Sequence, residues 1–80
     1  MKKITIRYFA KLRQERGSDR EIIETNASSA SELFHELKNK YNFSIDESHL
    51  KVAINEQYAK FDSPLKDNDC IVFIPPVAGG

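Results

Sequence analysis

Residues 29–41 read Ser-Ala-Ser-Glu-Leu-Phe-His-Glu-Leu-Lys-Asn-Lys-Tyr, and this stretch predicts the main helix of the protein. Ser29 and Glu32 have the spacing of a capping box, in which the two side chains satisfy two free amides at a helix start. Asn42 suits the left-handed backbone that often ends a helix. The apolar residues recur at helical spacing and form one stripe: Ala30, Leu33, Phe34, Leu37 and Tyr41.

Segments on both sides of this helix have the composition of β-strands. The first alternates polar and apolar residues, so Ile4, Ile6 and Tyr8 share one face. A short helical turn over 10–16, stopped by Gly17, separates the first two strands, which we expect to be neighbours. The predicted strands are Lys3–Phe9, Arg20–Thr25, Leu50–Asn55, a brief Tyr58–Phe61 and Cys70–Ile74.

The element order is β-β-α-β-β-β. So short a chain can bury its apolar residues in one core if the helix stripe covers one face of a mixed sheet. We therefore predict an α+β fold of the β-grasp, ubiquitin-like type, with four to five strands and one main helix on one face. Residues 1–75 are expected to form the domain, and residues 76–80 a flexible C-terminal tail.

Composition excludes several classes of function. A chain of 80 residues has a thin core with little room for an enclosed active site, so an enzyme acting alone is disfavoured. The formal net charge is zero, which argues against a nucleic-acid binder. No apolar stretch has membrane or signal-peptide length, and the single cysteine, Cys70, allows no internal disulfide. A cytoplasmic protein without nucleic-acid or membrane partners is expected.

Few residues suggest catalysis or metal binding. His35 and His49 have no Cys or second His at metal-ligand spacing, so we expect no metal site. Cys70 begins an apolar strand and is expected to pack. Asp67 and Asp69 resemble a fragment of a calcium loop but lack its downstream glutamate, and they are interpreted as turn residues.

The C-terminus is the strongest functional signal. Pro75 and Pro76 predict an extended exit from the last strand, and Val77 and Ala78 lead to Gly79 and Gly80. Five extended residues reach roughly 16 Å, and a tip without side chains can enter a narrow channel. The Gly80 carboxylate could thereby be presented to another protein's active site, where adenylation would make it reactive toward a sulfur or amine nucleophile.

Five segments spread along the chain carry a family resemblance: Tyr8–Arg13, the Ser29-capped helix, Val52–Asn55, Phe61–Asp69 and Phe73–Gly80. With these segments the whole chain resembles the small, sulfur-carrying subunits of molybdopterin synthases. Asn68 stands where that family usually has Gly, and Asn tolerates the same left-handed backbone.

The resemblance implies the β-grasp fold and a defined chemistry. A ubiquitin-activating-like adenylyltransferase would use ATP to adenylate Gly80, which would then become a thiocarboxylate. The molybdopterin synthase large subunit would take the tail, in a heterotetramer, and place the sulfur on the pterin precursor. The chain itself would bind no cofactor and would be a non-catalytic subunit.

Phe9, Tyr58 and Ile74 gain a role from the resemblance. Phe9 and Ile74 lie on strand faces opposite the expected core, and exposed apolar groups on a small domain favour a contact surface. We therefore expect these three residues to bind the partner.

Three alternatives remain open from the sequence. The same tail chemistry would serve a sulfur carrier for thiamine thiazole or for tRNA thiolation. A ubiquitin-like modifier would instead be conjugated to protein lysines. A plain interaction domain would use neither chemistry.

Overall fold

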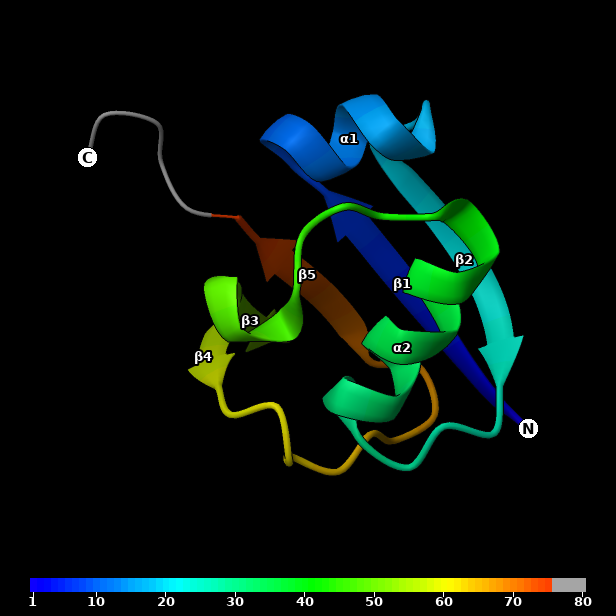
Figure 1. Cartoon of the computed structure of the whole chain (residues 1–80). Coiled ribbons are helices and arrows are strands. Elements are labelled where there is room, and N and C mark those ends of the chain that lie inside the picture. The colour runs from blue at the N-terminus through cyan, green and yellow to red at the C-terminus, as the bar shows by residue number, and fades with distance from the viewer. Residues whose placement is uncertain (76–80) are drawn as a thin grey trace.

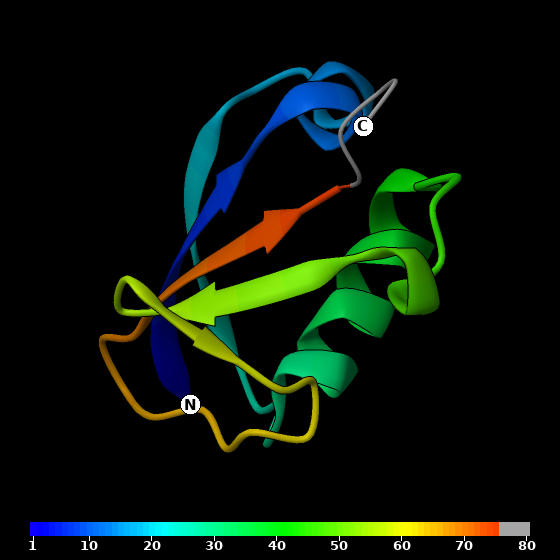
Figure 2. The ribbon, with the colours of Figure 1, turned by 90° about the vertical axis from the view of Figure 1, so that its left-hand side faces the viewer.

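The computed structural model describes residues 1–75 and shows a five-stranded mixed sheet with a helix across one face (Figures 1 and 2). The strand order is β2-β1-β5-β3-β4, and this arrangement confirms the predicted α+β, β-grasp fold. The elements in chain order are β1 (Lys2–Tyr8), α1 (Ala10–Arg16), β2 (Arg20–Thr25), α2 (Ala30–Tyr41), the 3-10 helix η1 (Glu47–His49), β3 (Lys51–Ile54), β4 (Gln57–Ala59) and β5 (Cys70–Ile74).

The first and last strands lie side by side inside the sheet. β1 and β5 run parallel, with Ile6 opposite Ile71 and Tyr8 opposite Phe73. The other neighbouring strands, β1 with β2, β3 with β5 and β3 with β4, are antiparallel. Parallel neighbours need a long connection, and here the chain from α1 through β4, which includes α2, runs between β1 and β5.

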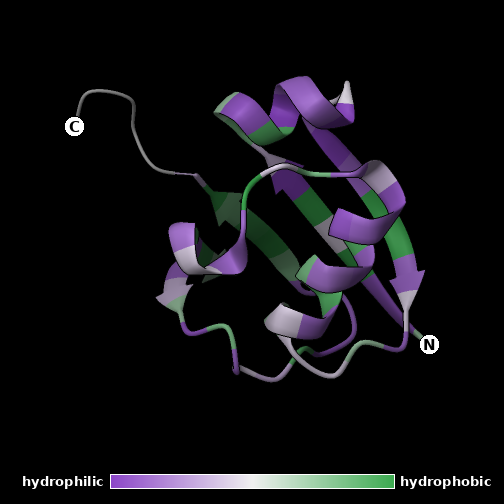
Figure 3. Ribbon diagram, in the orientation of Figure 1, coloured by the Kyte–Doolittle hydropathy of each residue, from purple (hydrophilic) through white to green (hydrophobic). Residues whose placement is uncertain are grey.

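The core lies between α2 and the sheet. The predicted inward residues Ile4, Ile6 and Tyr8 are at most 1% exposed, as are Ile71 and Phe73. Hydrophobic residues occur along β5 and in parts of β1 and β2 (Figure 3). The buried residues of α2 are Ala30, Leu33, Phe34 and Leu37. The alternation in β1 therefore predicted correctly which face of this strand is buried.

Helix α2 has the predicted bounds, but its cap is only half of a capping box. The Ser29 hydroxyl accepts a hydrogen bond from the Glu32 amide at 3.2 Å. The Glu32 carboxylate accepts from the amide and hydroxyl of Ser28 instead of closing back on Ser29. Asn42 ends the helix with φ of 57°, as expected.

The edge strand β4 differs from the prediction Tyr58–Phe61. Asn55 and Glu56 have φ of 53° and 72°, so a tight two-residue turn starts β4 at Gln57. Phe61 leaves the sheet because its ring packs on Phe73, with ring centroids 6.2 Å apart. Tertiary packing therefore overrides the local β-propensity of Phe61.

Candidate carrier terminus and docking face

The chain leaves the sheet from the end of its central strand. Ile74 pairs with Lys51 of β3, and Pro75, which is buried, is the last residue that the structure describes. On the other side of β5, Phe73 pairs with Tyr8, just before α1 begins. The predicted carrier residues Pro76, Val77, Ala78, Gly79 and Gly80 lie outside the described residues.

One face of the sheet has no helix over it in the part of the chain that the structure describes (Figure 2). Strand pairing aligns a row of outward residues across this open face: Arg20, Arg7, Val72, Ala53 and Tyr58. Their neighbours on β5, Ile71 and Phe73, are fully buried on the opposite face. We call the surface formed by this row, with Phe9, Ile22 and Ile74, the open face.

The open face carries the three predicted docking residues. Phe9 is 42% exposed and Tyr58 is 77% exposed, while Ile74 is half-buried. Phe9 follows β1 in extended backbone, and the Arg7 guanidinium lies 5.4 Å from the centre of its ring. Tyr58 is three strands from β1, which is about 14 Å at normal strand spacing. The three residues share one side of the domain but do not form a single compact cluster.

Sequence reasoning missed Ile22, which is 56% exposed on the same face. Ile22 and Ile23 are consecutive in a strand, and consecutive side chains point to opposite faces. One of the two isoleucines therefore had to face outward, and this exposure could have been predicted from the sequence. Ile23 is the one that packs against the core.

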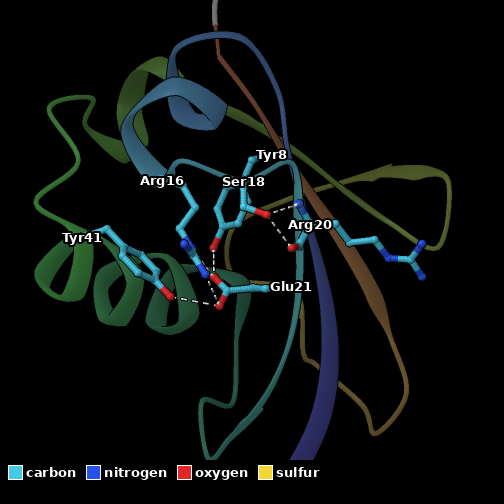
Figure 4. Close-up of polar contacts among 6 residues, drawn as sticks. All are labelled: Tyr8, Arg16, Ser18, Arg20, Glu21 and Tyr41. Atoms are coloured by element: carbon cyan, nitrogen blue, oxygen red, sulfur yellow. Dashed lines mark hydrogen bonds and ion pairs between the residues drawn. The ribbon is translucent and has the colours of Figure 1, made fainter.

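A polar cluster fixes the end of the sheet from which β5 exits (Figure 4). The Glu21 carboxylate of β2 accepts hydrogen bonds from the hydroxyls of Tyr8 at 2.5 Å and Tyr41 at 2.9 Å. It also accepts two bonds from the Arg16 guanidinium of α1, at 3.1 and 3.2 Å. That guanidinium lies 4.3 Å from the centre of the Tyr41 ring. One carboxylate thus joins β1, β2, α1 and α2.

The pKa values in this cluster are shifted by burial and by hydrogen bonding. Burial raises the pKa of Glu21, but hydrogen bonds from Arg16, Tyr8 and Tyr41 outweigh it, and the net pKa lies below the usual 4.5. Burial, followed by the bond to Glu21, raises the pKa of Tyr8. The cluster therefore holds a charged Glu21 carboxylate beside a protonated Tyr8 phenol, which is a structural arrangement rather than an acid–base pair.

The other candidate residues lie apart from one another. Cys70 is half-buried opposite Thr5 on the open face, and its amide donates to the Asn55 side chain at 2.9 Å. His35 is exposed, with Nε2 3.4 Å from the Glu47 carboxylate, and His49 is exposed in η1. Within residues 1–75, no three His, Cys, Asp or Glu side chains are grouped to hold a metal ion. No helix in that range has the length and apolar character needed to cross a bilayer.

The sequence matches the ThiS family over residues 6–80. The chain belongs to this family. A curated relative of this ThiS-family chain is the molybdopterin synthase sulfur carrier subunit of Escherichia coli, 28% identical over 96% of this chain and 99% of that protein. The resemblance to molybdopterin synthase small subunits predicted from the sequence is thereby confirmed.

Solved structures agree with this family membership. A molybdopterin converting factor subunit 1 from Pyrococcus furiosus, described as putative, is 31% identical and has a TM-score of 0.78 over 96% of this ThiS-family chain and 100% of that one. A complex of subunits 1 and 2 of the molybdopterin-converting factor from Helicobacter pylori contains a chain 26% identical to this one. Its TM-score is 0.67, and the match covers 98% of this chain and 99% of that one.

Proposed function

We propose that this chain is the sulfur-carrier subunit of a molybdopterin synthase and that the Gly80 carboxylate is its working group. The observation that carries the proposal is a match to a sulfur carrier subunit along nearly the whole of both chains. Gly79–Gly80 supports it, because a carboxylate that follows two residues without side chains could enter a narrow channel of another protein's active site.

The chemistry of the carrier would be acyl activation. A Gly80 carboxylate oxygen attacks the α-phosphorus of ATP, which forms an acyl adenylate and releases pyrophosphate. A hydrosulfide nucleophile then attacks the acyl carbon and displaces AMP, leaving a thiocarboxylate. Both steps would occur in a ubiquitin-activating-like adenylyltransferase, so the carrier needs no bound cofactor and is not an enzyme on its own.

The acceptor would be the molybdopterin synthase large subunit, where the sulfur is transferred to the pterin precursor. The two kinds of subunit would form a cytoplasmic heterotetramer. The solved two-subunit complex from Helicobacter pylori supports a partner of this kind. On this chain, the open face adjoins the exit of β5 and presents Phe9, Ile74 and Tyr58. Central apolar anchors usually supply most of the energy of such a contact.

The proposal is tested by intact-mass analysis of the chain after incubation with the adenylyltransferase, ATP and sulfide. The expected product has one terminal oxygen replaced by sulfur, and adding the large subunit and the pterin precursor should restore the original mass. Two variants serve as controls: one lacks Gly80, and one carries an alanine after it. Both should fold normally, as judged by circular dichroism, and neither should gain sulfur.

Other outcomes would favour a different function. Normal sulfur loading of the chain without Gly80 would refute the mechanism. Covalent adducts on other proteins would favour a ubiquitin-like modifier. Sulfur loading without transfer to the pterin precursor would favour a carrier for thiamine thiazole or for tRNA thiolation.

A further inference from the structure

Two arginines face each other on the open face without a compensating acid. Arg7 of β1 pairs directly with Arg20 of β2, and both side chains are exposed. The neighbouring pair, Tyr8 and Asp19, is joined by a backbone hydrogen bond of 3.0 Å, so Arg7 and Arg20 occupy a non-hydrogen-bonded position. Side chains come closest at such positions, and like charges placed there destabilise a sheet.

Neither arginine forms an ion pair within residues 1–75. The ion pairs among the described residues involve Arg16, His35 and Lys38, and none reaches Arg7 or Arg20. Glu24 lies on the same side of β2 as Arg20, but four residues along a strand is about 13 Å. Figure 4 shows the Arg20 side chain extending away from the Glu21 cluster, although the two residues are adjacent in sequence.

The arginine pair adjoins the apolar part of the open face. Arg7 is opposite Val72, which continues the row to Ala53 and Tyr58, and the Arg7 guanidinium contacts the Phe9 ring. An apolar centre with a polar, arginine-containing rim is the usual anatomy of a protein interface. Guanidinium groups bind carboxylates through paired hydrogen bonds, which makes an acidic partner the natural complement.

The edge of β2 is blocked at the same position. The Ser18 hydroxyl donates to the Arg20 carbonyl at 3.0 Å and accepts from its amide at 3.4 Å. These backbone groups point away from β1, so a partner that added a strand here would have to displace Ser18. Contact through the side chains on the open face is therefore favoured over strand addition.

We infer that Arg7 and Arg20 together form a carboxylate-binding site that receives Asp or Glu side chains of the large subunit. This inference rests on the proposed function, since it specifies the chemistry of that partner. Repulsion between Arg7 and Arg20 destabilises the free domain, and this repulsion is relieved when the acidic groups dock. The pair also accelerates encounter, because complementary charges steer association.

The decisive variant is Arg20→Glu, which should change stability and binding in opposite directions. In the free domain the substituted carboxylate faces Arg7 and attracts it, so the melting temperature should rise by about 2–4 °C. Against the large subunit the same carboxylate meets acidic groups, so affinity at low salt should fall at least about tenfold. Calorimetric titration and thermal melts measure the two effects.

Two further variants isolate the cause. Lys40→Glu makes the same change in net charge on α2, across the sheet from the open face, and should leave affinity within about twofold. Arg20→Gln should lose less affinity for the large subunit than Arg20→Glu and more than Lys40→Glu. Added salt should weaken the wild-type complex steeply and the Arg20→Glu complex little, so that the two affinities converge.

Several results would overturn the inference. Unchanged affinity of Arg20→Glu would do so, as would an equal loss in Lys40→Glu or a fall in the melting temperature of Arg20→Glu. Arg20-dependent binding of a duplex oligonucleotide, with large-subunit binding unaffected by the substitution, would show that the pair recognises phosphates. Failure of the wild-type chain to bind the large subunit at all would instead refute the proposed function, and the inference with it.

Discussion

Replacing Glu21 by Ala should destabilise the domain by about 3 kcal/mol. The Glu21 side chain is only 13% exposed and accepts four hydrogen bonds, so its removal leaves several donors without a partner. The Tyr8 hydroxyl belongs to a residue that is 1% exposed, and an unsatisfied buried donor costs about 1–3 kcal/mol. Loss of the charge-assisted bonds from the half-buried Arg16 adds a similar amount.

Urea unfolding followed by circular dichroism at neutral pH measures this loss. In a domain of this size, about 3 kcal/mol lowers the melting temperature by roughly 12–24 °C. Tyr8→Phe should cost only about 1 kcal/mol, because Glu21 keeps its bonds from Arg16 and Tyr41. In the Tyr8→Phe background, Glu21→Ala should cost less than it does in the wild type, because the two side chains interact.

The same cluster predicts a dependence of stability on pH. The folded-state pKa of Glu21 lies below its usual value of 4.5, so the unfolded chain binds a proton more readily than the folded one. The stabilisation from Glu21 is therefore present above pH 4.5 and is lost as the pH falls through the folded-state pKa. Glu21→Gln should show a shallower loss of stability across this range.

Two results would contradict the stabilising role of the Glu21 cluster. One is a cost of Glu21→Ala below about 0.5 kcal/mol, and the other is strict additivity of Glu21→Ala with Tyr8→Phe.

The remaining predictions concern docking, the cysteine and the β3–β4 turn. Phe9→Arg or Ile74→Arg should weaken binding of the large subunit by about thirty-fold or more in calorimetric titration, with little change in melting temperature. Normal binding, or simple unfolding, would contradict the assignment of faces. Cys70→Ser should retain sulfur loading by intact mass, and a folded variant that fails to load would reveal a working thiol. Glu56→Gly should stabilise the domain by up to about 1 kcal/mol in urea unfolding, because a non-glycine residue is strained at φ of 72°.

The local elements could be predicted from the sequence because their signals are local. The Ser29 cap, the apolar stripe and Asn42 determine the bounds of α2, and all three act within a few residues. The alternation in β1 determines which of its side chains are buried. Gly79–Gly80, which supports the functional proposal, is likewise a property of the sequence alone.

The short connection between β1 and β2 predicted that these two strands are neighbours, but the tertiary structure decided how the more distant strands pair. No local pattern places β5 beside β1, and only that pairing makes the end of β5 emerge next to Phe9 and α1. The Glu21 cluster draws on four separate elements, and its members carry no common sequence signal. Arg7 and Arg20 are thirteen positions apart in the sequence, and they face each other only because the β1–β2 register aligns them. Such contacts arise from packing between distant segments, which the periodicity of a single segment does not encode.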